Sequence, residues 1–171
     1  MRKTVIVVIM QLLMFFSIAG QSTVWTTPDK SITVSVPVPL KRAVQYNWDL
    51  ISNSEKEEGY NSIATFTGER DGITFLVQVL QPNALLKSMK VSEKLEGLEF
   101  IVGGDDDQDY IEIWDNRGGL HTRELSYRKQ NVRFLSIDGG DRIYVLAMTA
   151  KHKKSLVSVV AEKFFQPEIQ P

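Results

Sequence analysis

Residues 60–80 read YNSIATFTGERDGITFLVQVL, and this stretch decides the fold. Its two outer runs, 60–67 and 73–80, are rich in β-branched and aromatic residues, which favour strands. Between them lies GERDG, in which Asp71-Gly72 supplies the positive φ angles of a tight hairpin turn. The second run has apolar side chains on both faces: Ile73, Phe75, Val77 and Val79 on one, Leu76 and Leu80 on the other. A strand of this kind is covered on both sides, so the pattern predicts a central strand.

Further strands are expected on both sides of this hairpin. Upstream, Ile32, Val34 and Val36 alternate with polar residues, and prolines at positions 37 and 39 end that run. Downstream, four runs are separated by links with hairpin chemistry: Tyr110–Trp114, Leu120–Tyr127, Val132–Ile137 and Arg142–Thr149. Strands linked in this way are sequential antiparallel neighbours. The tail Glu168–Pro171 either pairs briefly at a sheet edge or frays.

Two segments have helical spacing. The first begins at Asn83, a candidate N-cap, and stops at Gly97, with Leu85, Leu86, Met89 and Leu95 as its apolar stripe. The second covers Lys151–Phe165, with a stripe of Leu156, Val159, Val160 and Phe164 that Lys163 interrupts. We therefore predict an α+β fold: one antiparallel sheet of about six to seven strands, mostly hairpin-connected, with two helices packed on its faces.

The first twenty residues have the layout of a secretory signal peptide. Two basic residues, Arg2 and Lys3, precede an apolar run that ends in small side chains, and Ser17 and Ala19 suit a peptidase cut before Gly20. We expect residues 1–19 to be the signal and residues 20–171 to be a single exported domain, periplasmic or secreted. An uncleaved anchor is the alternative, but the run from Thr4 to Ala19 is shorter than the roughly 20 residues that span a bilayer. No second long apolar segment follows, so no membrane span is expected after cleavage.

Composition excludes several classes of function. The chain has no cysteine, which removes thiolate catalysis, cysteine-based zinc sites and disulfides. Its formal charge is −1, and loss of Arg2 and Lys3 with the signal takes it to −3. A weakly acidic domain has no basic excess for nucleic acid phosphates, so no nucleic acid partner is expected.

Four groups of residues allow both a functional and a plainer structural interpretation. Asp105-Asp106-Asp107-Gln108-Asp109 offers hard oxygens for calcium, but Tyr110 and Asn116 stand where a calcium loop needs Gly and Glu, so we interpret it as a solvated loop. The histidines, His121 and His152, lack metal spacing and are expected at the surface. Core or helix-facing packing is favoured for Trp25, Trp48 and Trp114 over a binding role. The basic run Lys151–Lys154 is interpreted as a variable loop, with contact to an anionic surface as the alternative.

No motif of a nucleophile elbow, zinc protease or phosphate loop is present in the sequence. We therefore predict no catalytic, cofactor-binding or metal residues and no cofactor. Paired carboxylates for glycoside hydrolysis stay open, because they are set by space rather than by spacing.

Several features together resemble the PsbP/Mog-like fold and its exported bacterial members. These are an aromatic residue before a Thr-Pro-Asp turn (residues 25–29), a strand ending in proline (32–37), a Gly-Asp-Arg-Ile-Tyr strand (140–146) and the ending AEKFFQP (161–167). Pro167 departs from the family, which usually has serine there. The resemblance covers nearly the whole exported part. It implies a sheet with helices packed on it and no enzymatic activity, and it transfers no catalytic residue.

The leading hypothesis is an exported, non-enzymatic accessory or binding domain that acts through protein or envelope contacts. Two alternatives are a cell-envelope hydrolase with unplaced carboxylates, and a secreted inhibitor or immunity protein that plugs a cleft with loop 105–109. The partner and the oligomeric state are not predicted.

Overall fold

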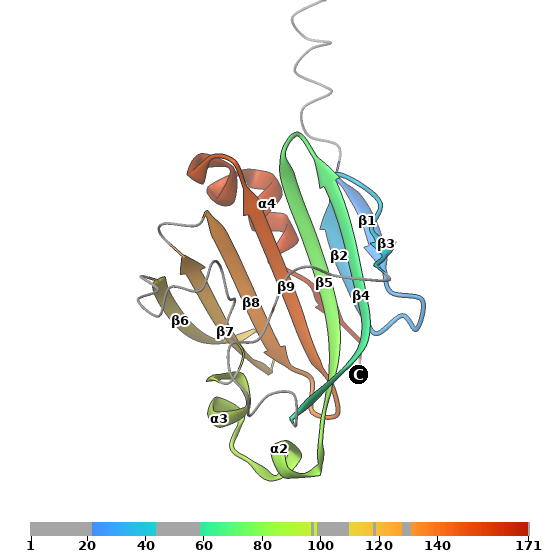
Figure 1. The fold of residues 1–171 in the computed structure, drawn as a ribbon, viewed down its shortest axis with the longest axis vertical. Coiled ribbons are helices and arrows are strands. Elements are labelled where there is room, and N and C mark those ends of the chain that lie inside the picture. Colours follow the sequence, from blue (N-terminus) through green and yellow to red (C-terminus); the bar gives the residue numbers. More distant parts are fainter. Residues whose placement is uncertain are drawn as a thin grey trace, which may run out of the picture.

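A seven-stranded antiparallel sheet forms the body of the domain (Figure 1). The structure, a computed structural model, describes residues 22–43, 59–96, 98, 110–117, 119–127 and 131–170. Across the sheet the strands are β3 (Lys41–Arg42), β4 (Tyr60–Arg70), β5 (Ile73–Pro82), β9 (Ile143–Ala150), β8 (Val132–Asp138), β7 (Leu120–Tyr127) and β6 (Tyr110–Arg117). This confirms a mostly antiparallel α+β fold.

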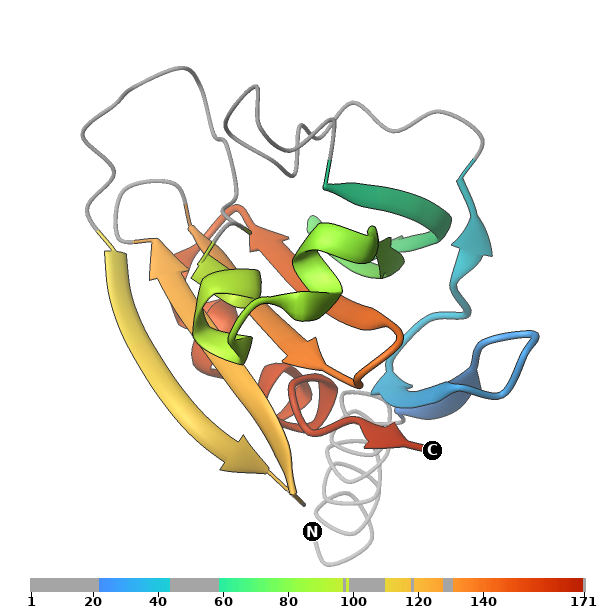
Figure 2. The ribbon, with the colours of Figure 1, turned by 90° about the horizontal axis from the view of Figure 1, so that it is seen from below.

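A second, three-stranded sheet was not predicted. It consists of β1 (Thr23–Thr26), β2 (Ile32–Val36) and β10 (Glu168–Ile169), in that order. β10 pairs with β2 through Glu168↔Thr33 and Ile169↔Ile32, so the tail does pair at an edge. Figure 2 shows β10 and α4 in red beside the N-terminal strands in blue, although they are far apart in sequence. The prediction of a single sheet was therefore incomplete, because pairing between the two ends of the chain leaves no local signal.

The β4–β5 hairpin has a shorter turn than expected. Both strands extend through the predicted five-residue link, and only Asp71 and Gly72 remain between them, with φ angles of 55° and 71°. Positive φ at both positions defines the two-residue turn that matches the twist of the strands. β5 is central, as predicted, with β4 on one side and β9 on the other.

The two faces of the sheet contribute to two separate cores. One contains Phe75, Val77 and Val79 of β5 with side chains of β2, β8 and β9 and with Ala161, Phe164 and Phe165. The other contains Leu76 and Leu80 of β5 with Leu95, Leu98 and further side chains of β7, β8 and β9. The alternation in β5 thus assigns consecutive residues to different cores, as the sequence predicted.

The segment 83–97 is not one continuous helix. Asn83 caps α2 (Ala84–Ser88) by accepting a hydrogen bond from the Leu86 N–H at 2.9 Å, as predicted, but the chain becomes extended at Met89 before α3 (Val91–Glu96) begins. Because of this break, residues before and after Met89 do not lie on one continuous helical face. As a result Leu85 is 64% exposed and Met89 is exposed, contrary to the predicted stripe, while Lys94 and Leu95 are buried.

A buried ion pair explains how Lys94 is accommodated. Its Nζ lies 2.5 Å from Oδ2 of Asp138, and the two side chains are 8% and 5% exposed. The Tyr60 hydroxyl donates to the backbone carbonyl of Lys94. Burial, and after it the negative charge of Asp138, raises the pKa of Tyr60 to about 12.

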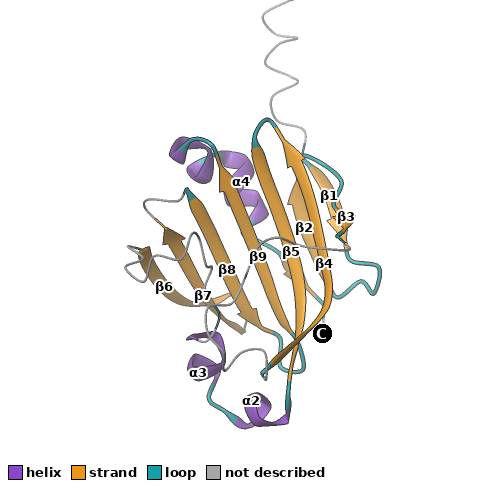
Figure 3. Cartoon of the chain, in the orientation of Figure 1, coloured by secondary structure: helices purple, strands orange, loops and turns teal. Residues whose placement is uncertain are grey.

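The C-terminal helix is likewise divided. A 3₁₀ helix, η1 (Lys153–Val157), precedes α4 (Val159–Phe164), and the Ser158 hydroxyl caps α4 by accepting from the Ala161 N–H at 3.3 Å. Val159 is 73% exposed, contrary to the predicted stripe, whereas Ala161 and Phe165 are buried. Figure 3 shows the short helices outside the sheets, α2 and α3 at one end and α4 toward the other. None of the described helices is long and apolar enough to cross a bilayer.

Candidate binding surfaces

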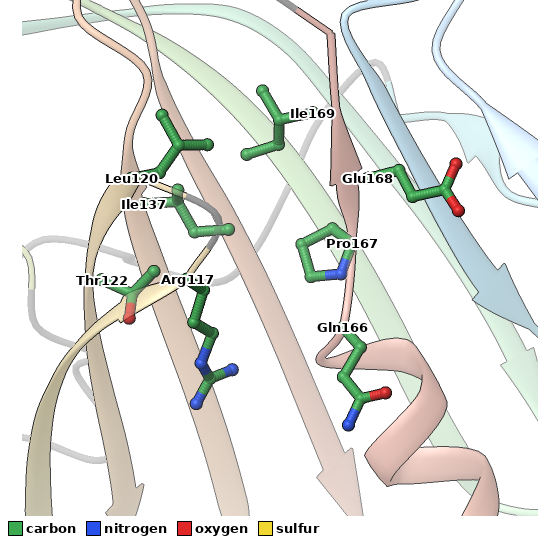
Figure 4. A pocket seen from close by; sticks show the side chains of 8 residues that line it. All are labelled: Arg117, Leu120, Thr122, Ile137, Gln166, Pro167, Glu168 and Ile169. Atoms are coloured by element: carbon green, nitrogen blue, oxygen red, sulfur yellow. The ribbon is translucent and has the colours of Figure 1, made fainter.

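An open groove lies between β10 and the ends of β7 and β8. It consists of two adjoining hollows of about 410 and 580 Å³, which share Leu120 and Ile169 as lining residues. Figure 4 shows the first: Leu120, Ile137, Thr122 and Arg117 on one side, and Gln166 to Ile169 on the other. The second extends past Tyr144 to the turns around Asp29 and Asp141.

The C-terminal segment positions one wall of this groove. Phe164 and Phe165 are fully buried in the first core, and Phe164 packs edge-on against Phe75 with ring centroids 5.2 Å apart. The chain then leaves α4 through Gln166-Pro167 and enters β10, whose only described strand partner is β2. Ile169 therefore lines the groove opposite Leu120.

The cation on the rim of the groove is already engaged. Arg117 lies 2.9 Å from Glu124 and 3.3 Å from Asp115, and it donates to the Phe165 carbonyl at 3.0 Å. Glu124 is also bound by Arg133 at 2.6 Å. These contacts fasten the end of β6 to the C-terminal segment, so Arg117 shapes the groove rather than offering a free cation to an anion.

The carboxyl groups lining the second hollow are held in their ionised form. Partial burial raises the pKa of Asp29, but hydrogen bonds from Thr27, Ser31 and Arg142 outweigh it and place that pKa well below its usual range. A hydrogen bond from Lys87, together with its charge, lowers the pKa of Asp141. A general acid at neutral pH needs the opposite shift. The geometry of these two carboxylates favours structural ion pairing over proton donation.

The most exposed apolar strand is β6, at one edge of the large sheet. Ile111, Ile113 and Trp114 are 48%, 50% and 42% exposed, and in the part of the chain that the structure describes β6 pairs only with β7. Its acidic side chains are neutralised within the domain, Glu112 by Arg123 at 2.5 Å and Asp115 by Arg117. The edge therefore presents apolar side chains whose neighbouring charges are compensated.

The opposite edge is protected. β3 consists of only two residues, Lys41 and Arg42, both exposed. Very short edge strands with basic side chains are a common way to prevent unwanted strand pairing. Of the two outer strands of the large sheet, β6 is therefore the one that presents several exposed apolar side chains.

The sequence candidates are dispersed rather than gathered into one site. His121 and His152 are exposed, as predicted, and Trp25 packs on the first core, 4.9 Å from Phe66. Trp114 is more exposed than predicted and lies 5.6 Å from the Arg123 guanidinium. Trp48 and the acidic loop 105–109 lie outside the described residues. Among the residues described, no three histidine or acidic side chains are placed to hold a metal ion.

The groove and the open edge were both missed by sequence reasoning. Alternation in 110–114 indicated a strand, but whether a strand is an edge depends on how distant segments pair. No protein-family model matches this sequence, and no curated protein matches it at a significant level.

Proposed function

We propose that this protein is an exported accessory domain that binds a partner protein by adding one strand of that partner to β6. The observation that supports this most directly is the exposure of Ile111, Ile113 and Trp114 along an edge strand. An edge offers unpaired backbone donors and acceptors, and strand addition uses them for affinity while side-chain contacts give specificity.

The charges around β6 define the chemistry of the partner strand. Because Glu112 and Asp115 are paired internally, charge on β6 does not select a partner. Apolar contact does, so we expect β-branched or aromatic residues at alternating positions on the side that meets Ile111 and Ile113. A second copy of this chain could also supply such a strand, and light scattering would detect the resulting self-complex.

Two further parts of the proposal concern the faces of the sheet that the helices cover and the family to which the domain belongs. We infer that α3 covers one face of the sheet and α4 the other, which leaves the β6 edge as the open side, in a PsbP/Mog-like domain without catalytic activity. The hydrolase alternative is less well supported at the groove, because Asp29 and Asp141 are held in ion pairs with Arg142 and Lys87, and their lowered pKa values do not suit a general acid. Loop 105–109, on which the inhibitor alternative depends, lies outside the described residues.

The test is cross-linking in the cell envelope followed by hydrogen exchange on the isolated complex. We expect a partner that protects backbone amides of residues 110–117 and that is lost with Ile113→Lys. Val24→Lys is the matched control, because Val24 is 76% exposed on an edge strand of the smaller sheet. Light scattering of the purified protein identifies a self-complex. A complex that leaves 110–117 unprotected, or that survives Ile113→Lys, contradicts the proposal.

A further inference from the structure

The residues that follow β9 combine exposed basic and apolar side chains, and they lie at the end of the domain that is uppermost in Figure 1. The tip of the β4–β5 hairpin and the start of η1 meet there, because the Lys151 N–H donates to the Gly72 carbonyl at 3.4 Å. Lys151, Lys153 and Lys154 are exposed, and His152 lies among them. Within the described part of the chain these three lysines make no ion pair.

Two exposed valines follow directly after these lysines. Val157 is 72% exposed and Val159 is 73% exposed, at the end of η1 and the start of α4. Leu156, between the lysines and Val157, is buried in the first core and fixes this segment to the domain. Basic side chains beside exposed apolar ones are the composition that suits the boundary between lipid headgroups and acyl chains.

The beginning of the described chain lies at this same end. The Thr23 hydroxyl donates to the Val36 carbonyl at 3.0 Å, and Arg70, at the hairpin tip, donates to the neighbouring Pro37 carbonyl at 2.8 Å. The apolar segment ending at Ala19 precedes Thr23 by four residues, which span at most about 14 Å when fully extended. A signal or anchor in that segment, as its sequence predicts, would bring this end of the domain to a bilayer.

We propose that this end is a peripheral membrane surface, which binds anionic phospholipid headgroups through Lys151, Lys153 and Lys154 and places Val157 and Val159 at the headgroup boundary. The surface is separate from the β6 edge and does not depend on the function proposed for it. Lipid phosphates satisfy the unpaired lysines, while the valines leave water; an acidic protein would satisfy only the lysines.

The strength of the contact follows from the number of lysines. Each basic residue near an anionic membrane contributes roughly 1 kcal/mol, about a fivefold change in affinity. Removing two of the three lysine charges should therefore weaken binding about 25-fold. Binding should also weaken as salt is added, because exposed charges are screened.

The experiment is co-sedimentation of the exported protein with lipid vesicles. The protein is purified from the cells that export it, and mass spectrometry identifies its N-terminus. Vesicles of phosphatidylcholine with phosphatidylglycerol are compared with vesicles of phosphatidylcholine alone. We expect binding to the anionic vesicles only, a loss of about 25-fold with Lys153→Gln/Lys154→Gln, and a loss with Val157→Ser/Val159→Ser. The matched control is Lys87→Gln/Lys90→Gln, two exposed lysines in α2 and in the link that follows it, at the other end of the domain, which should not change binding.

A second measurement applies if the N-terminal segment is not cleaved. Because the chain has no cysteine, Val157→Cys can carry a single polarity-sensitive dye in protein reconstituted into vesicles, with Lys90→Cys as the reference position. We expect a blue shift at position 157 that requires phosphatidylglycerol, and none at position 90. Three results would overturn the proposal. They are equal binding to both vesicle types, equal effects of the two lysine pairs, and capture by an acidic protein without vesicle binding.

Discussion

Replacing Lys94 by methionine tests whether the buried ion pair holds α3 on the sheet. Lys94 and Asp138 are 8% and 5% exposed, with 2.5 Å between Nζ and Oδ2. The other carboxylate oxygen of Asp138 accepts from the Gly140 N–H at 2.9 Å. Methionine fills the space of the lysine stem but leaves a buried carboxylate without its cation. Breaking a buried pair in this way costs about 3–5 kcal/mol.

The consequence is measurable by urea and thermal unfolding. For a domain of this size, about 1 kcal/mol corresponds to roughly 2–4 °C, so the melting temperature should fall by about 6–20 °C. Adding Asp138→Asn should restore most of this loss, because asparagine removes the charge and keeps an acceptor for Gly140. Lys87→Met, which breaks the exposed pair with Asp141, should cost less than about 1 kcal/mol. The reasoning is refuted if Lys94→Met costs no more than Lys87→Met, or if the double variant is no more stable than the single one.

Two further substitutions probe other charges. Arg123 is 2% exposed and donates to the Leu95 and Leu98 carbonyls, each at 3.0 Å. Arg123→Met should therefore lower the free energy of unfolding in urea by about 3–5 kcal/mol and increase hydrogen exchange in α3. Unchanged exchange in α3 would contradict this role of Arg123. Asp29 has a lowered pKa, so its stabilising effect is present above about pH 4 and is lost as the pH falls. Because Asp29 is exposed, Asp29→Asn should cost at most about 1 kcal/mol at pH 7 and less at pH 3; a difference that grows toward acid would have the wrong sign.

The parts of the fold that depend on neighbouring residues were predictable. Asp71-Gly72 specifies a turn by itself, and the alternation around Phe75 and Leu76 indicates two covered faces without reference to the rest of the chain. The helix boundaries failed for a comparable local reason. Apolar spacing continued through Met89 and Ser158, but the backbone N–H of each donates to a carbonyl three residues earlier and closes a short helical segment. The Ser158 hydroxyl then caps the start of α4.

The binding surfaces could not be predicted because each depends on distant segments. β6 is an edge only because β9 returns to pair with β5, with Leu80 opposite Ile143. The groove exists because β10 pairs with β2, more than 130 residues away in sequence. The basic run at 151–154 was visible, but its position at the same end of the domain as Thr23 follows from the fold.

The two ends of β9 separate the surfaces. Lys151 follows β9 at one end, and the Gly139-Gly140 turn and Tyr144, which border the groove, lie at the other. Eight strand residues, Ile143–Ala150, place these ends about 25 Å apart. A domain held to a membrane by its basic end would therefore turn the groove away from the lipid, and β6 would run along its side. This geometry lets lipid and a partner strand occupy the domain at the same time, because neither surface uses residues of the other.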